Sequence, residues 1–140
     1  MIISKDDEGY LVKVFKEYLP CNFDIFDKES IVLVFRDILV KLKEKYQIRG
    51  VIEIDAYVQE EYGMILEIRE TCPYYEEMDV HIHFHLDAVF LTEIDMEDIA
   101  KRQEVYYYKD RFYSIYSKVC DCSIIYKDCD DILEHAIRIH

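Results

Sequence analysis

Residues 27–58 read DKESIVLVFRDILVKLKEKYQIRGVIEIDAYV and join the two patterns that decide the fold. Asp27 suits a helix N-cap, and lysines crowd the far end, where the helix dipole favours cations. Gly50 follows as a helix stop signal. Between them, apolar residues recur at three- and four-residue steps, as on one face of a helix. This pattern predicts a helix over about 28–48, with a stripe formed by Ile31, Phe35, Ile38, Leu42 and Tyr46.

Directly after this helix, apolar residues recur at every second position, which is typical of strands with one buried face. Residues 51–58 alternate, residues 64–69 alternate again, and 59–63 reads as a hairpin loop between them. A third strand is predicted at 80–86, with Val80, Ile82, Phe84 and Leu86 facing inward and His81, His83 and His85 facing outward. We expect the polar sides of these three strands to form one acidic, histidine-bearing face that includes Glu53, Asp55 and Glu67.

The rest of the chain alternates short strand and helix signals. We predict strands at 10–18 (paired with Ile2 and Ile3), 104–108, 112–117 and 123–126, a short acidic helix at 96–102 and a C-terminal helix at 129–137. Together these elements indicate an α+β fold, in which a mostly antiparallel sheet of five to seven strands packs on the long helix. No internal repeat or linker is visible, so residues 1–140 are expected to form a single domain.

The charge of the chain is concentrated in its middle. Residues 51–104 hold 15 acidic and three basic residues, a balance of −12 out of the total of −13. Residues 1–50 hold nine of each, and residues 105–140 hold six acids and five bases. Such a block repels nucleic-acid phosphates and anionic lipid and attracts basic surfaces. Direct binding to nucleic acid or to a membrane is therefore not expected.

The acidic block suggests a non-enzymatic protein-binding protein that docks on a basic surface of a partner. Inhibitors of nucleic-acid enzymes, immunity proteins and nucleic-acid mimics share this physics. Tyrosine is also favoured in binding patches, and the chain has 13 of them. The candidate partner-binding residues are Glu60, Glu61, Glu76, Glu77, Asp79, Glu93, Asp95, Glu97, Asp98, Tyr107 and Tyr113.

The histidine row at 81–85 carries an alternative, a metal-binding protein. Alternate residues of a strand share a face, so two of His81, His83 and His85 can hold one zinc ion. The outer pair lies about 13 Å apart, which is too far for one ion. A site would need help from a carboxylate such as Asp79 or Glu53. The competing interpretation is the polar outer face of a strand, and no other cofactor is expected.

No catalytic constellation is recognisable, so we do not expect an enzyme. The serines have no G-x-S-x-G setting, and the glycines stand alone rather than in a phosphate loop. Cys120 and Cys122 are too close for the usual zinc knuckle, and acidic neighbours oppose a redox role with Cys129. Five cysteines, no signal peptide and no long apolar run favour reduced thiols in a cytoplasmic protein.

One further pattern is a resemblance. Gly50-Val51-Ile52-Glu53-Ile54-Asp55-Ala56-Tyr57 and Gly63-Met64-Ile65-Leu66-Glu67-Ile68 follow a strand and a long helix. This order resembles the N-terminal domain of the MecA adaptor family over about half of the chain. The resemblance implies an adaptor that delivers substrates to an unfoldase, and for this chain an adaptor or regulator binding through its apolar, Tyr-rich surface.

Overall fold

The computed structural model describes all residues except 75, 87, 103, 117–124, 127–128 and 140. The chain divides into two compact units, Met1–Leu86 and Asp87–His140, and each unit has its own five-stranded sheet. The α+β class is confirmed, with one long helix and two sheets rather than one.

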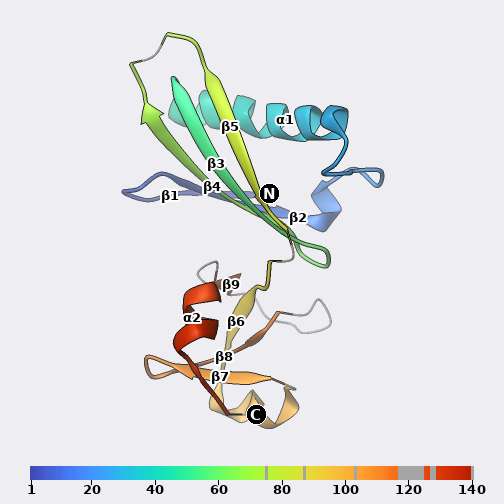
Figure 1. The fold of residues 1–140 in the computed structure, drawn as a ribbon, viewed down its shortest axis with the longest axis vertical. Helices are drawn as coiled ribbons and strands as arrows, with labels where there is room; N and C mark the ends of the chain where they lie inside the picture. The colour runs from blue at the N-terminus through green and yellow to red at the C-terminus, as the bar shows by residue number, and fades with distance from the viewer. Residues whose placement is uncertain (75, 87, 103, 117–124, 127–128, 140) are drawn as a thin grey trace. The chain divides into compact units, whose positions relative to one another are not determined.

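The first unit is a sheet with the strand order β1-β2-β4-β3-β5 (Figure 1). Neighbouring strands are antiparallel, except that β5 runs parallel to β3. β5 therefore lies at one edge of the sheet, and among the described strands it pairs only with β3. The strands are β1 (Ile2–Lys5), β2 (Tyr10–Phe15), β3 (Val51–Gln59), β4 (Gly63–Cys72) and β5 (Asp79–His85).

The helix α1 (Lys28–Tyr46) covers one face of this sheet. Its N-cap is Asp27, as predicted, and the Asp27 carboxylate accepts a hydrogen bond from the Glu29 N–H. The helix ends at Tyr46, earlier than predicted, because Gln47 adopts a left-handed conformation (φ 56°) and its N–H donates to the Lys43 carbonyl.

The core of the first unit lies between α1 and the sheet. Every second residue of the central strands faces the helix, as the alternation predicted, and these side chains are excluded from solvent. This burial supplies the main driving force for folding the unit. The fully buried members are Val12, Val14, Ile38, Leu42, Ile52, Ile54, Ala56, Met64, Leu66 and Ile68.

Two predictions for this unit need correction, and one is confirmed. The strand predicted at 10–18 ends at Phe15, because a short 3-10 helix, η1 (Lys16–Tyr18), follows it. Leu86 was expected to face inward with Phe84, but β5 ends at His85 and Leu86 is 44% exposed. The hairpin of Ile2 and Ile3 with the following strand is confirmed.

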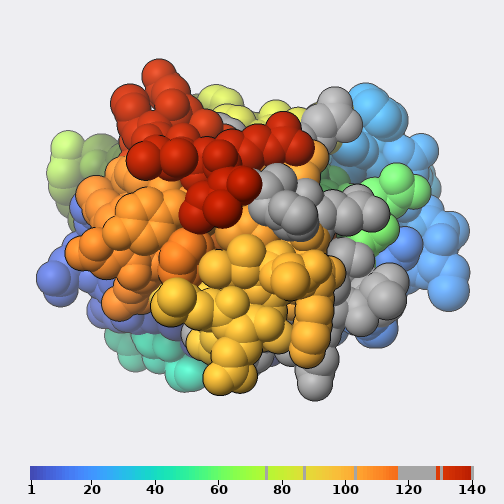
Figure 2. Space-filling view, turned by 90° about the horizontal axis from the view of Figure 1, so that it is seen from below, coloured from blue at the N-terminus to red at the C-terminus, as the bar shows by residue number. Residues whose placement is uncertain are grey.

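The second unit is a separate small sheet with the order β10-β7-β8-β6-β9. The Tyr-rich hairpin and the short acidic helix are confirmed near the predicted positions, and α2 packs beside β7 (Figure 2). The predicted C-terminal helix ends at His135, because the chain turns back to pair with β7. The elements are β6 (Leu91–Ile94), η2 (Met96–Lys101), β7 (Val105–Tyr108), β8 (Arg111–Ile115), β9 (Ile125–Tyr126), α2 (Cys129–His135) and β10 (Ile137–Arg138).

Candidate functional site: the carboxylate–histidine face

The sheet of the first unit has a second face, opposite α1, on which charged side chains gather. In-register pairs place Glu53 beside His81, and Asp55 between His83 and Glu67. The predicted common face of these residues is therefore confirmed. We call it the carboxylate–histidine face and define it as Glu53, Asp55, Glu67, Arg69, Asp79, His81, His83 and His85.

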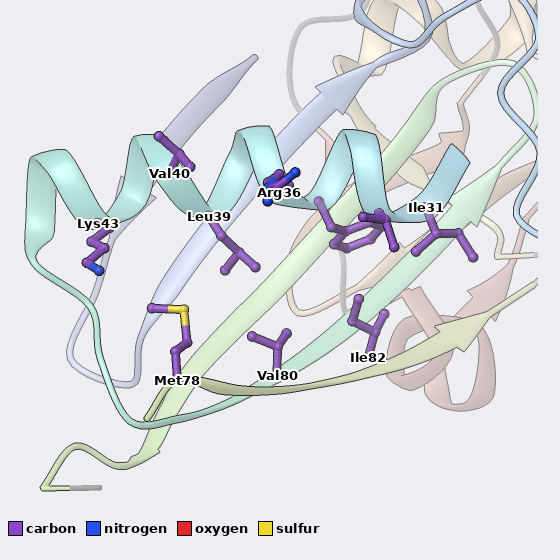
Figure 3. A pocket seen from close by; sticks show the side chains of 10 residues that line it. Ile31, Arg36, Leu39, Val40, Lys43, Met78, Val80 and Ile82 are labelled. Carbon is purple, nitrogen blue, oxygen red and sulfur yellow. The ribbon is translucent and has the colours of Figure 1, made fainter. Parts of the chain in front are cut away.

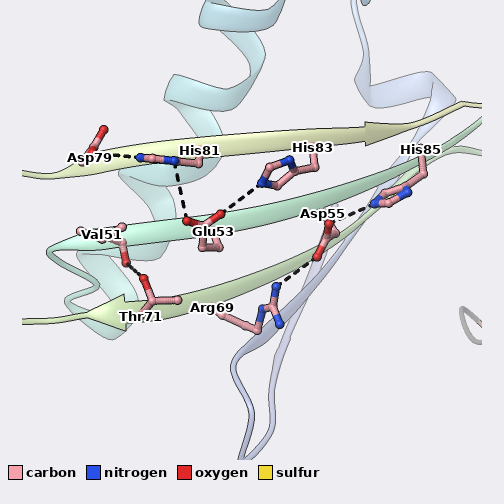
Figure 4. Close-up of polar contacts among 9 residues, drawn as sticks. All are labelled: Val51, Glu53, Asp55, Arg69, Thr71, Asp79, His81, His83 and His85. Atoms are coloured by element: carbon pink, nitrogen blue, oxygen red, sulfur yellow. Dashed lines mark hydrogen bonds and ion pairs between the residues drawn. The ribbon is translucent and has the colours of Figure 1, made fainter.

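Each histidine of β5 contacts a carboxylate (Figure 4). His81 lies between Asp79 and Glu53, with its Nε2 2.9 Å from Asp79 Oδ2 and its Nδ1 3.7 Å from Glu53 Oε1. His83 Nε2 lies 3.3 Å from the other oxygen of Glu53, and His85 Nε2 lies 3.0 Å from Asp55 Oδ1. Glu53 thus has two imidazole partners, His81 and His83, and Asp55 has one, His85.

Two residues of the neighbouring strands complete this arrangement. Arg69 donates to the second oxygen of Asp55 at 3.3 Å. Tyr57 stacks on the ring of His85, with ring centroids 4.5 Å apart and an angle of 13° between the planes. Tyr57 lies on the same side of β3 as Glu53 and Asp55, because it alternates with the buried Ile54 and Ala56. The parallel register that sets it beside His85 carries no local sequence signal.

The histidine row makes the charge of this face depend on pH. The hydrogen bond and charge of Asp79 raise the pKa of His81 above its ordinary value of 6.5, with a further contribution from Glu53. Four carboxylates and Arg69 give the face a charge of −3 with neutral histidines, and protonation of His81 changes it to −2. Because the three imidazoles are 45–62% exposed, a partner can reach them directly.

The histidines of β5 are far apart and already have carboxylate partners among the described residues. Among the described residues, no group of three His, Cys, Asp or Glu side chains is placed to hold one ion. Neighbouring histidines are about 7 Å apart along the strand, and each turns to a carboxylate instead. Zinc binding at His81, His83 or His85 stays an untested prediction.

The predicted partner-binding acids of the first unit lie at both ends of this face. Glu60 and Glu61 are in the β3–β4 turn, and Glu76 and Glu77 are in the β4–β5 connection. The two pairs are about 30 Å apart, which is the length of a ten-residue strand such as β4. All four side chains are exposed, and none forms an ion pair or hydrogen bond with a described residue. Asp79 lies at the same end as Glu77 and contacts His81.

The remaining predicted acids belong to the second unit. Glu93 on β6 pairs with Arg111 at 3.4 Å, and Asp98 pairs with Lys101 at 3.7 Å. Asp95 and Glu97, next to or in η2, are exposed. The two ion pairs offset part of the negative charge around η2.

The two predicted tyrosines of the second unit differ in accessibility. Tyr113 is 5% exposed, and burial raises the pKa of its hydroxyl. Tyr107 is half-buried and donates to Asp110 at 2.7 Å, and this hydrogen bond raises the pKa of Tyr107. Cys120 and Cys122 lie outside the described residues. Cys129 is buried and its Sγ accepts the Leu91 N–H at 3.0 Å, which favours a structural role for this thiol.

Comparison with known proteins finds no matching family model, no matching curated protein and no matching solved structure. The resemblance to MecA adaptors therefore stays a prediction from the residues quoted above. Within the described part of the chain, no helix has both the length and the apolar character needed to cross a membrane.

Proposed function

We propose that this chain is a non-enzymatic protein-binding protein that docks on a basic surface of a partner through the carboxylate–histidine face. The observation that carries this proposal is the layout of the first unit. One face of its sheet holds the core under α1, while the other carries the carboxylates of Glu53, Asp55, Glu67 and Asp79. Two exposed acidic pairs, which have no ion-pair partner among the described residues, flank that face at its ends.

The size of this surface suits a single partner. A standard interface buries about 800 Å² on each side, which corresponds to a patch about 30 Å across. The distance between the two acidic ends of the face is similar, about 30 Å. The surface from the Glu60 and Glu61 turn to the Glu76 and Glu77 connection can therefore lie within one interface.

The charge of the whole chain supports the same proposal. A net charge of −13 accelerates the approach of a basic partner, and salt screens this attraction. Glu53 and Asp55 are 25% and 22% exposed and already paired. We therefore propose that Glu53 and Asp55 hold the neighbouring side chains of the face in place. The exposed acids at its ends attract the basic partner and speed its association.

Charge reversal tests this function. A partner is captured from host lysate at low salt, identified, and its affinity is measured by calorimetry. Glu60→Lys with Glu61→Lys removes one acidic end, and Glu76→Lys with Glu77→Lys removes the other. Each double reversal should weaken binding by about tenfold or more, and the four together should abolish it.

The matched control carries the same change of charge away from this face. Glu44, on α1, and Glu134, on α2, are exposed, and reversing both to Lys gives an identical net charge. This control should keep most of the affinity. Equal weakening by test and control variants would show that only the total charge matters. If the partner stays bound at high salt and its affinity is unchanged by all the reversals, the result would favour the Tyr-rich adaptor hypothesis instead.

A further inference from the structure

On the other side of the same sheet, α1 and the edge strand β5 leave an apolar groove of about 400 Å³ (Figure 3). α1 contributes Val32, Leu39 and Val40, and β5 with the residue before it contributes Met78, Val80 and Ile82. Val32 and Val40 are both 48% exposed. Apolar side chains are thus gathered along the groove and remain in contact with water, as at a binding site for another chain.

The edge strand beside this groove is open to pairing. β5 pairs with β3 on one side, and no described strand lies on its other side. Edge strands that avoid further pairing usually carry charged side chains, above all lysine, or a proline or a bulge. β5 reads DVHIHFH and has no proline, lysine or bulge, and its one carboxylate, Asp79, is its first residue. Its outer backbone N–H and C=O groups are therefore free to accept an added strand.

Two basic residues of α1 line the groove. Arg36 and Lys43 line it, both are exposed, and neither pairs with a carboxylate among the described residues. By contrast, Lys41 on the same helix pairs with Asp37 at 3.1 Å. Seven residues of helix separate Arg36 from Lys43, a distance of about 10 Å along the axis. This spacing is close to that of three or four residues of an extended chain.

We propose that the groove and the free edge of β5 bind an extended acidic–apolar peptide segment of a partner protein as an added strand. Backbone hydrogen bonds to β5 hold the segment, and its alternate apolar side chains fill the groove beside Val80 and Ile82. Carboxylates of the segment pair with Arg36 and Lys43. This site lies on the helix side of the sheet and does not depend on the carboxylate–histidine face.

Charge complementarity favours a peptide over a second copy of this chain. A second β5 pairing at this edge would offer only Val80, Ile82 and Phe84 on the helix side. None of these three residues carries a carboxylate, so the added β5 itself would offer no partner to Arg36 or Lys43. An acidic–apolar segment satisfies the apolar and the charged parts of the groove together.

The test uses labelled seven-residue peptides and fluorescence anisotropy with the full chain. The probe has the sequence Glu-Thr-Val-Thr-Glu-Thr-Ile. A second probe has the same residues in the reverse order. A comparison probe has lysine in place of each glutamate. The glutamate probe should bind, and Arg36→Glu with Lys43→Glu should weaken it about tenfold or more. The same double variant should bind the lysine probe better than the unmodified chain does.

The controls separate strand addition from general charge attraction. Lys5→Glu with Lys16→Glu, on β1 and η1, makes the same charge change outside the groove and should leave binding unchanged. Methylating alternate backbone nitrogens of the probe should abolish binding, because the added strand then loses its donors to β5. The proposal is overturned if neither probe direction binds at about 1 mM, or if methylation has no effect. A dimer in light scattering with protected β5 amides would also overturn it and assign this edge to a second copy.

Discussion

Replacing Gly50 by alanine should destabilise the first unit strongly. Gly50 has φ +78°, and a Cβ there would lie 2.0 Å from the carbonyl oxygen of Cys72 at the end of β4. The Gly50 carbonyl also accepts the N–H of Asp79 at 3.0 Å, where β5 begins. One residue therefore sets the spacing of the three strands that carry the carboxylate–histidine face.

The size of the effect follows from two terms. Holding alanine in the left-handed region costs about 1–2 kcal/mol. The clash involves backbone atoms of Cys72 and Pro73, so strands must shift, at about 1–3 kcal/mol more. The expected loss in the free energy of unfolding is about 2–5 kcal/mol. A unit of 86 residues has about 4–13 kcal/mol in total, so the loss is a large part of it.

Urea unfolding, followed by far-UV circular dichroism, measures this loss. Hydrogen exchange of the β3 amides reports the first unit separately from the second. The Gly50→Ala variant should lower the urea midpoint and speed exchange throughout β3. A change below about 0.5 kcal/mol, the range of an ordinary surface substitution, would refute the close approach of Gly50 to Cys72.

Three further predictions concern the helix end, the histidine row and the core. Gln47→Gly should raise the free energy of unfolding by about 1 kcal/mol, because glycine adopts the left-handed conformation without strain; a lower urea midpoint would contradict this. Asp79→Asn should lower the pKa of His81 in an NMR titration, since Asp79 is the main cause of its upward shift. The stabilisation from His81 protonation is complete below pH 6.5 and is lost as the pH rises through the raised pKa, so the variant should lose this pH dependence. Ile54→Ala should cost about 2–5 kcal/mol in urea unfolding, whereas Ile2→Ala at an exposed site should cost less than about 0.5.

The elements with a long or regular period could be predicted from the sequence. The apolar stripe of α1 and the cap at Asp27 placed the helix within two residues of its observed ends. The alternation in β3 and β4 assigned the correct side chains to each face, including Glu53 and Asp55. Local periodicity is sufficient to assign these faces, because successive side chains of a strand point to opposite sides of the sheet and only one side is buried.

The neighbours of each strand could not be predicted in the same way. The parallel pairing of β5 with β3, which brings His83 to Glu53 and stacks His85 on Tyr57, depends on the path of the intervening connection. Alternation fixes which residues share a face but not which strands lie side by side. The strand β6 was missed because four residues carry too little pattern to detect.

The groove could not be predicted from the sequence either. Val32 and Val40 lie beside the predicted stripe of α1 and resemble ordinary scattered surface residues. Arg36 and Lys43 resemble the solvent-facing side of any amphipathic helix. Their significance depends on β5 being the edge strand under this side of the helix, which only the three-dimensional arrangement shows.

The most direct test of the central claim is an NMR titration of the isotope-labelled chain with the captured basic partner. We predict that the imidazoles of His81, His83 and His85 shift, together with the amides of 59–63 and 76–79 at the two ends of the face. Added salt should reverse these shifts. Shifts confined to the Tyr-rich hairpin at 105–115, with the histidines unchanged, would contradict the proposal that this face docks on a basic surface.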